Sequence, residues 1–398
     1  MNHIHRNKGY KPEMLADGPV RELITATCDT LTEPLHNIGL RQEVPPELTA
    51  AIDENTFYFS GFKTHHELVE ASRLLKGDDG NFKPFEQFRR DVEAIDSTYN
   101  RNYLQAEYNF AAAASQMAVK WKEWEQDGDD YDLQYRTAGD DRVREEHAAL
   151  DGVTLPPSDP FWNSYLPPNG WNCRCTTVQV RKGKYPQSDP EEAAARGAAC
   201  TARPKQQIFR FNPGKQQKIF PPKHPYFPKG CGDCSYKRLA EGKNSSNCKA
   251  CRTLGGIEKQ REEREATSTA RNNAINSISD GTFKNELLGL ENIETGFLYK
   301  SRKSVKNLLH HSINVAEIET AMSLIDHLDK LEFVRNSYLG EGKNLKDPIE
   351  QQKIQKKIDR GIIGYNIYYY KYNGRRWCVK TEVSYRGDET LYSFTKKP

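Results

Sequence analysis

The spacing of apolar residues predicts that the first part of the chain is mainly helical. Apolar side chains recur every three or four residues over Pro19–Ile38 and again over His65–Leu75, as on one face of an amphipathic helix. A longer run over Phe85–Glu125 is rich in strong helix formers. After it, alternating residues over Tyr131–Thr137 predict a short strand, and the Pro- and Gly-dense stretch Leu155–Gly170 predicts a loop.

The last third of the chain combines helices with an antiparallel sheet. Apolar residues at helical spacing over Val315–Leu331 predict a helix. Residues 365–372 and 375–385 flank Asn373-Gly374, the residue pair typical of a type I′ hairpin turn. Residues 390–397 add a third strand. Helices followed by such a meander indicate an α+β domain.

Composition narrows the classes of protein that this chain can be. Its 398 residues suffice for two or three domains. The apolar fraction is 36% and the mean hydropathy is −0.84, and no run approaches the roughly 18 apolar residues of a membrane-spanning helix. Aromatic residues make up 10%, too many for a wholly disordered chain. We therefore expect ordered domains and no membrane insertion.

Charge divides the chain into segments of opposite sign. Residues 1–202 contain 22 Lys and Arg against 33 Asp and Glu, whereas residues 203–265 contain 15 against 6 and residues 296–398 contain 19 against 12. The basic second half indicates a polyanionic partner such as nucleic acid, or simply a solvated surface. A short helix and connector at 190–207 and a charged helix or linker at 256–273 place domain boundaries near 202 and 265.

The N-terminal sequence has no apolar stretch of the kind that secretory signals contain. We therefore expect synthesis in a reducing cytoplasm, where cysteines bind metals more often than they form disulfides.

Four cysteines have the spacing of a structural zinc site. Cys231 and Cys234 form one Cys-x2-Cys pair, and Cys248 and Cys251 form a second after thirteen intervening residues. Two such pairs can close a tetrahedral site around zinc, and the polar segment between them would then fold on metal binding. The alternative is two disulfides, which a reducing compartment disfavours.

A second group of candidate ligands lies in the first half. Cys173 and Cys175 form a Cys-x-Cys motif downstream of His147. A metal could bind both thiols with the histidine completing the set, or both thiols could simply pack in a core.

The segments around this motif, YRTAGDDRVREEHAALDG (135–152) and PFWNSYLPPNGWNCRCTTVQV (160–180), resemble the signature of the phage Mu F-like minor head proteins. The residues in the signature's places are Arg142, Arg144, His147, Asp151, Gly152, Cys173, Arg174 and Cys175. Many members have a His just before Asn-Cys-Arg-Cys, where this chain has Gly170-Trp171. The resemblance covers roughly residues 60–200. It implies a head morphogenesis protein present in few copies near the portal, with portal and capsid proteins as partners and no known catalytic act.

The C-terminal region, with a core at about residues 290–398, resembles the phage branch of the barnase, EndoU, colicin and RelE-like nucleases. The resemblance rests on residues 296–311, 316–337 and 365–394. It implies a metal-independent RNase toxin, with RNA as substrate and a cognate immunity protein as a further partner.

Metal-free RNA cleavage needs a proton acceptor and donor, together with cations around the phosphate. His310 and His311 are candidates for proton transfer, or they are surface or capping residues. On the strand at 375–385, alternation places Arg376, Cys378, Lys380 and Glu382 on one face, and Trp377, Val379, Thr381 and Val383 on the other. Arg376 and Lys380 are candidates for binding phosphate, and Thr381, Tyr392 and Ser393 for binding substrate at the sheet edge. Ordinary solvent-facing sheet residues are the alternative. The tyrosines of the run at 368–372 (Tyr368, Tyr369, Tyr370 and Tyr372) could stack on bases. The alternative is that half of such a run packs in a core.

The sequence thus predicts a multidomain protein. An α-rich head-morphogenesis region (1–202) is followed by a basic zinc-knuckle connector (203–265) and a nuclease-like α+β domain with an antiparallel sheet (266–398). Such a protein would be made in the bacterial host cytoplasm and then enter the phage head. The alternatives are an inert tail that binds packaged DNA or the portal, and an ADP-ribosyltransferase tail.

Overall fold

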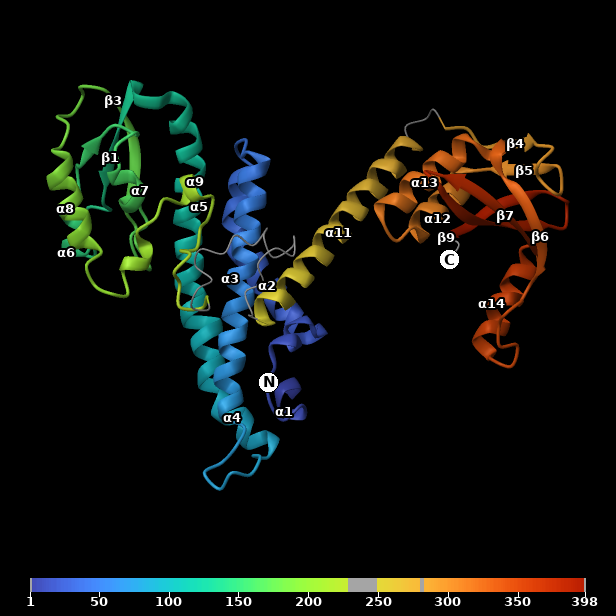
Figure 1. Ribbon diagram of the computed structural model, residues 1–398, viewed down its shortest axis with the longest axis horizontal. Coiled ribbons are helices and arrows are strands. Elements are labelled where there is room, and N and C mark those ends of the chain that lie inside the picture. The colour runs from blue at the N-terminus through green and yellow to red at the C-terminus, as the bar shows by residue number, and fades with distance from the viewer. Residues whose placement is uncertain (1, 228–248, 280–282, 397–398) are drawn as a thin grey trace. The chain divides into compact units, whose positions relative to one another are not determined.

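The computed structural model describes residues 2–227, 249–279 and 283–396 (Figure 1). The chain forms two compact units, unit 1 (Met1–Glu258) and unit 2 (Lys259–Pro398). Unit 1 combines a helical bundle with a small sheet, and unit 2 is built on a larger sheet. None of the described helices has both the length and the apolar character that a membrane span requires.

The bundle of unit 1 contains the helices that the apolar spacing predicts. Its helices are α1 (Asn2–Arg6), α2 (Gly18–Gly39), α3 (Pro46–Arg73), α4 (Phe85–Ser97) and α5 (Leu104–Asp127), with a 3-10 turn at Pro12–Ala16. Helix α2 packs against α3 and α5 through a stripe that includes Ile24, Leu31 and Leu35. The predicted helix over His65–Leu75 is the end of the longer α3. The middle of α3 is buried on all sides, so it lacks the amphipathic spacing that would have predicted it.

The long helix expected over Phe85–Glu125 is confirmed, with one irregularity inside it. A π-helical turn at Thr98–Tyr103 separates α4 from α5. Within this turn, the Tyr99 hydroxyl donates a hydrogen bond to Glu70 (3.0 Å) and the Asn100 amide donates one to Glu67 (3.2 Å). Because these hydrogen bonds are made to α3, the helix propensity of the residues in α4 and α5 cannot predict the π-helical turn.

A three-stranded antiparallel sheet follows the bundle. Its strands are β1 (Tyr131–Arg136), β2 (Thr154–Leu155) and β3 (Thr176–Arg181), in the order β2-β1-β3. The short helices around it are α6 (Glu145–Ala148), α7 (Phe161–Tyr165) and α8 (Pro190–Cys200). Strand β1 confirms the predicted strand. Helix α7 lies within the predicted loop, where Phe161 and Trp162 are buried in the core of this sheet.

The first described part of the predicted connector, residues 203–227, packs into the core of the bundle. It contains a 3-10 turn at Gln207–Phe209 and the short helix α9 (Pro213–Gln216). The ring of Phe220 stacks on Phe59 with centroids 3.7 Å apart. Asn55 on α3 accepts hydrogen bonds from the backbone N–H groups of Ile219 and Phe220 (3.1 and 2.9 Å). This stretch therefore contributes apolar side chains to the core of the bundle and is not only a basic linker.

Unit 2 confirms the predicted α+β architecture. Helix α11 (Lys249–Ser277) leads into it, and its sheet has the order β4-β5-β9-β8-β7-β6. The strands are β4 (Glu286–Gly289), β5 (Phe297–Lys300), β6 (Glu332–Tyr338), β7 (Ile362–Tyr372), β8 (Arg375–Ser384) and β9 (Glu389–Lys396). The helices are α12 (Arg302–His311), α13 (Val315–Asp326) and α14 (Pro348–Asp359), with a 3-10 turn at Leu328–Lys330. All pairs are antiparallel except β5 with β9, so the sheet is mixed.

One face of this sheet is covered by α12 and α13. Leu308 of α12 and Leu324 of α13 share an apolar core with Tyr368, Trp377 and Val379 of the sheet. In the same layer, the fully buried carboxylate of Glu389 accepts hydrogen bonds from Thr381, Tyr368 and Asn366.

Candidate metal centre

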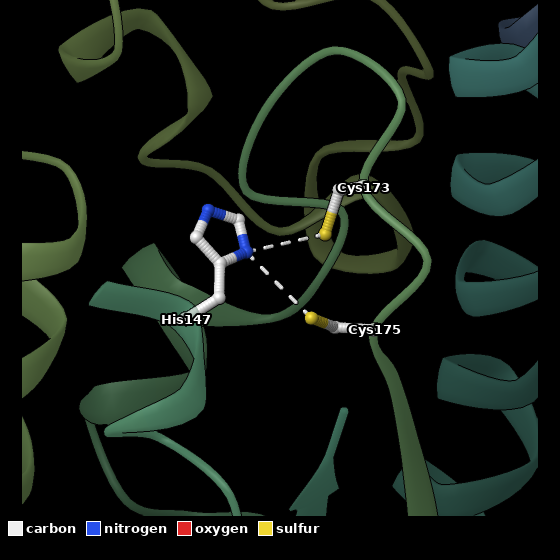
Figure 2. A group of neighbouring side chains, drawn as sticks. All are labelled: His147, Cys173 and Cys175. Atoms are coloured by element: carbon white, nitrogen blue, oxygen red, sulfur yellow. Dashed lines mark hydrogen bonds between the residues drawn. The ribbon is translucent and has the colours of Figure 1, made fainter. Parts of the chain in front are cut away.

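The fold brings together the second group of candidate ligands, His147, Cys173 and Cys175 (Figure 2). His147 is on the one-turn helix α6, Cys173 is in the loop that follows the Pro-rich segment, and Cys175 immediately precedes β3. All three are buried, at 2%, 8% and 7% exposure. In the sequence, His147 lies 26 positions before Cys173 and 28 positions before Cys175. The three residues meet because β1 pairs with β3 and α6 lies in the connection between β1 and β2.

The two sulfurs face the same nitrogen of the histidine. Nδ1 of His147 lies 3.5 Å from Sγ of Cys173 and 3.6 Å from Sγ of Cys175, and all three atoms lie within 4.8 Å of one another. A cavity of about 30 Å³ adjoins them, large enough for an ion or one water molecule. Two thiols and an imidazole are the ligands that zinc prefers in proteins. These three residues therefore fit a zinc ion, with three donors.

The pKa values of the two thiols are shifted in opposite directions. A hydrogen bond from Cys175, aided by His147, holds the pKa of Cys173 well below its usual value against the opposing effect of burial. The same hydrogen bond and burial raise the pKa of Cys175. A negatively charged sulfur is thus favoured at Cys173, and a thiolate is the form that binds a metal.

Arg144 contacts the far side of the histidine ring. Its Nη1 lies 3.0 Å from Nε2 of His147, and its Nη2 donates a hydrogen bond to the backbone oxygen of Trp171. A guanidinium has no acceptor, so in this arrangement Nε2 accepts and Nδ1 carries the ring proton. For Nδ1 to bind a metal, that proton must leave and Arg144 must move away from Nε2. Gly170 leaves space for Arg144, because a Cβ atom there would lie 2.8 Å from Nη1.

Charged side chains connect the segments that carry the three candidate ligands. Arg174, between the two cysteines, forms an ion pair with Asp140 (2.5 Å), and this hydrogen bond lowers the pKa of the Asp140 carboxyl. Asp151 accepts a hydrogen bond from the backbone N–H of Thr137 (2.7 Å). These contacts hold the strand ends and loops that carry the three ligands.

Of the four cysteines predicted to form a zinc site, only Cys251 lies in the described part of the chain. Cys231, Cys234 and Cys248 lie outside the described residues, so the predicted four-cysteine zinc site stays a prediction. Cys251 lies in α11, where it is fully buried.

The predicted nuclease residues of unit 2 lie on opposite sides of its sheet. His310 and His311 are exposed at the end of α12, on the helix-covered side. The predicted alternation along β8 is confirmed, and Arg376 and Lys380 point to the other face, which α12 and α13 leave open and which α14 contacts in part. The structure therefore does not bring the histidines together with Lys380.

On the open face, Lys380 belongs to a cluster of lysines and tyrosines. Its Nζ lies 3.9 Å from the centre of the Tyr365 ring, and Tyr365 lies 5.7 Å from Tyr392. Burial and the nearby charge of Lys357 lower the pKa of Lys380. Lys357 itself donates to Tyr365 and Glu382, and these bonds raise its pKa although burial alone would lower it.

The expectation that Thr381, Tyr392 and Ser393 lie at the sheet edge is wrong. Strands β8 and β9 are interior, because β5 pairs with the far side of β9 and leaves β4 and β6 as the edges. Thr381 is fully buried and donates its hydroxyl hydrogen to Glu389, whereas Tyr392 and Ser393 are half-buried. Within the tyrosine run, Tyr368 and Tyr370 pack in the core, which agrees with the alternative that half of the run is buried.

Comparison with known proteins shows that the candidate metal centre lies in a stretch that is similar to a known family. Residues 82–178 match the family described as "Phage Mu protein F like protein". The provisionally named capsid assembly protein F of Escherichia phage Mu is 50% identical over 42 residues, which are 11% of this chain and 10% of that protein. The Mu-like prophage FluMu F protein of Haemophilus influenzae is 39% identical over 64 residues, 14% of this chain and 16% of that protein.

These alignments span only a small part of each relative, and no solved structure matches the chain. The matched range nevertheless contains His147, Cys173 and Cys175. Residues 82–178, including the candidate metal centre, are therefore similar to the phage Mu F-like family.

Proposed function

We propose that this chain is a head morphogenesis protein of a Mu-like phage or prophage and that it takes part in capsid assembly with other phage head proteins. The observation that carries the proposal is the Mu F-like match over residues 82–178, together with the names of the two relatives, one a capsid assembly protein and one a prophage protein.

In this proposal the metal centre is structural. His147, Cys173 and Cys175 come from three separate segments around the small sheet, so a bound zinc ion would fix α6 and the Cys-x-Cys loop to β3. The ion would supply folding free energy, since such ligands gather only in the folded chain. This structural role needs no catalytic step.

Deletion and complementation test the role in assembly. Removal of the gene from a lysogen should abolish DNA-filled heads after induction, and the wild-type chain should restore them. A His147→Ala, Cys173→Ser double variant should restore few heads, whereas Cys378→Ser in unit 2 should restore them fully. Normal head yield without the gene would contradict the proposal.

We further propose that unit 2 is the RNase-like part of the protein. Support comes from its α+β architecture and from the cluster of Lys380, Tyr365 and Tyr392 on the open face of the sheet. Because His310 and His311 lie on the covered side, Lys380 is the better candidate for contact with a phosphate.

Expression of the full chain in the cytoplasm tests this second proposal. Growth arrest with cleaved RNA is expected, and it should be lost in Lys380→Ala but kept in His310→Ala with His311→Ala. Harmless accumulation of folded full-length chain would contradict an RNase role and favour a unit that only binds packaged DNA or the portal.

A further inference from the structure

A fourth cysteine lies beside the metal centre. Cys200 is the last residue of α8, is completely buried, and belongs to the same core cluster as Cys173 and Cys175. It lies outside the Mu F-like match, which ends at residue 178.

The pKa of Cys200 agrees with a position near the candidate metal centre. Burial and the negative charge of Cys173 together raise the pKa of the Cys200 thiol to about 12. Cys200 in turn helps to raise the pKa of Cys175 and of the Tyr135 hydroxyl. The geometric basis is that the Cys200 side chain is buried in the same core cluster as Cys173 and Cys175, and that α8 contacts α6, which carries His147.

Helix α8 is fixed against the helix that carries His147. Arg196 donates a hydrogen bond to the backbone oxygen of Ala149 at the end of α6 (3.4 Å), and Arg203, just beyond α8, forms an ion pair with Glu146 of α6 (3.7 Å). Gly197 allows close packing, because a Cβ atom there would lie 2.5 Å from the ring of Tyr165. The backbone of Cys200 is therefore held beside the site independently of any metal.

We propose that Cys200 is the fourth ligand of a Cys3His metal site formed with His147, Cys173 and Cys175. Its sulfur lies outside the group of atoms that are within 4.8 Å of one another, so the proposal requires a rotation about the Cα–Cβ bond of Cys200 that brings the sulfur to the metal. A fourth protein ligand closes the tetrahedral shell, which is the arrangement of structural zinc sites, whereas three ligands would leave a position open. This inference concerns the metal centre alone and stands whether or not the chain functions in a phage head.

The number of sulfur ligands tests the proposal directly. Full-length chain with Cys231→Ser and Cys234→Ser, which removes one pair of the other predicted zinc site, would be loaded with zinc and studied by X-ray absorption at the zinc edge. We expect three sulfur neighbours and one nitrogen. Two sulfurs with two lighter neighbours would overturn the proposal, and this measurement needs no change at Cys200 itself.

Substitution gives an independent measurement. In the same background, Co²⁺ should show thiolate charge-transfer absorption that falls by about one third in Cys200→Ser, since three thiolates become two. Zinc affinity should fall by more than the roughly 10–100-fold that loss of an outer-shell partner costs. The control Cys378→Ser should change neither quantity. Unchanged absorption and affinity in Cys200→Ser would overturn the assignment, and loss of metal from His147→Ala but not from Cys200→Ser would restrict the site to three ligands.

Discussion

Replacement of Glu67 by Gln should make unit 1 more stable at neutral and alkaline pH. Glu67 is on α3, is 1% exposed and accepts a hydrogen bond from Asn100. Burial, with a smaller contribution from Asp96, raises the pKa of its carboxyl from 4.5 to about 7, although Asn100 and Lys63 oppose the rise.

The sign and size of the effect follow from this pKa. The folded state keeps a proton on Glu67 at pH values where the unfolded state has lost it, so the free energy of unfolding falls as the pH rises from about 4.5 to about 7. One pKa unit corresponds to about 1.36 kcal/mol. The penalty for folding with Glu67 is therefore about 1 kcal/mol at pH 5 and about 3 kcal/mol at pH 8.

Glutamine has the same shape, keeps an acceptor for Asn100 and carries no charge at any pH. Four of the five tryptophans (Trp121, Trp124, Trp162 and Trp171) are in unit 1, so urea unfolding followed by tryptophan fluorescence reports mainly on this unit. Glu67→Gln should be more stable than wild type by about 3 kcal/mol at pH 8 and by about 1 kcal/mol at pH 5. The exposed Glu93→Gln is the control and should differ from wild type at neither pH. A Glu67→Gln protein that is equally stable at both pH values, or less stable at pH 8, would refute the reasoning.

Three other substitutions test the packing of the two units. Lys63→Ala leaves the buried carboxylate of Glu107 without its ammonium partner and should destabilise unit 1 by about 3–5 kcal/mol in the same unfolding assay. Gly214→Ala should cost about 1–3 kcal/mol, because the new Cβ atom would lie 2.3 Å from Cβ of Trp121. Glu389→Ala removes the acceptor of three buried hydrogen bonds and should accelerate hydrogen exchange in β7 and β8, whereas unchanged exchange would show that this network does not support the sheet.

The elements that could be predicted are those whose signal is local. Helix α2 and strand β1 follow from the spacing of their own apolar residues. The β7–β8 hairpin follows from Asn373 and Gly374, which adopt the positive φ values of 48° and 69° that the turn requires.

Other elements depend on contacts that local patterns do not contain. Strands β4 and β5 have only four residues each, and β6 is exposed at every position except Ser337, so none of the three shows the alternation of a half-buried strand. The sequence does not reveal β5, which pairs with β9. The prediction therefore places residues of β9 at an edge of the sheet, whereas β9 is an interior strand.

The candidate site shows the same division. Its cysteine and histidine types and the Cys-x-Cys spacing made His147, Cys173 and Cys175 candidates, and their meeting in one cluster agrees with that prediction. Cys200 has no spacing that relates it to Cys175, and only the docking of α8 on α6 brings it near. In unit 2, alternation correctly assigned residues to the two faces of β8, but it could not indicate which face the helices cover.

Mass spectrometry of purified heads tests the central claim most directly. Particles from an induced culture of the bacterium that carries the gene would be separated from free protein, and peptides from residues 82–178 would be quantified against the major capsid protein. We predict that these peptides co-purify with DNA-filled heads at a small, constant ratio. Their absence from heads, with the chain present in the same lysate, would contradict a role in the phage head.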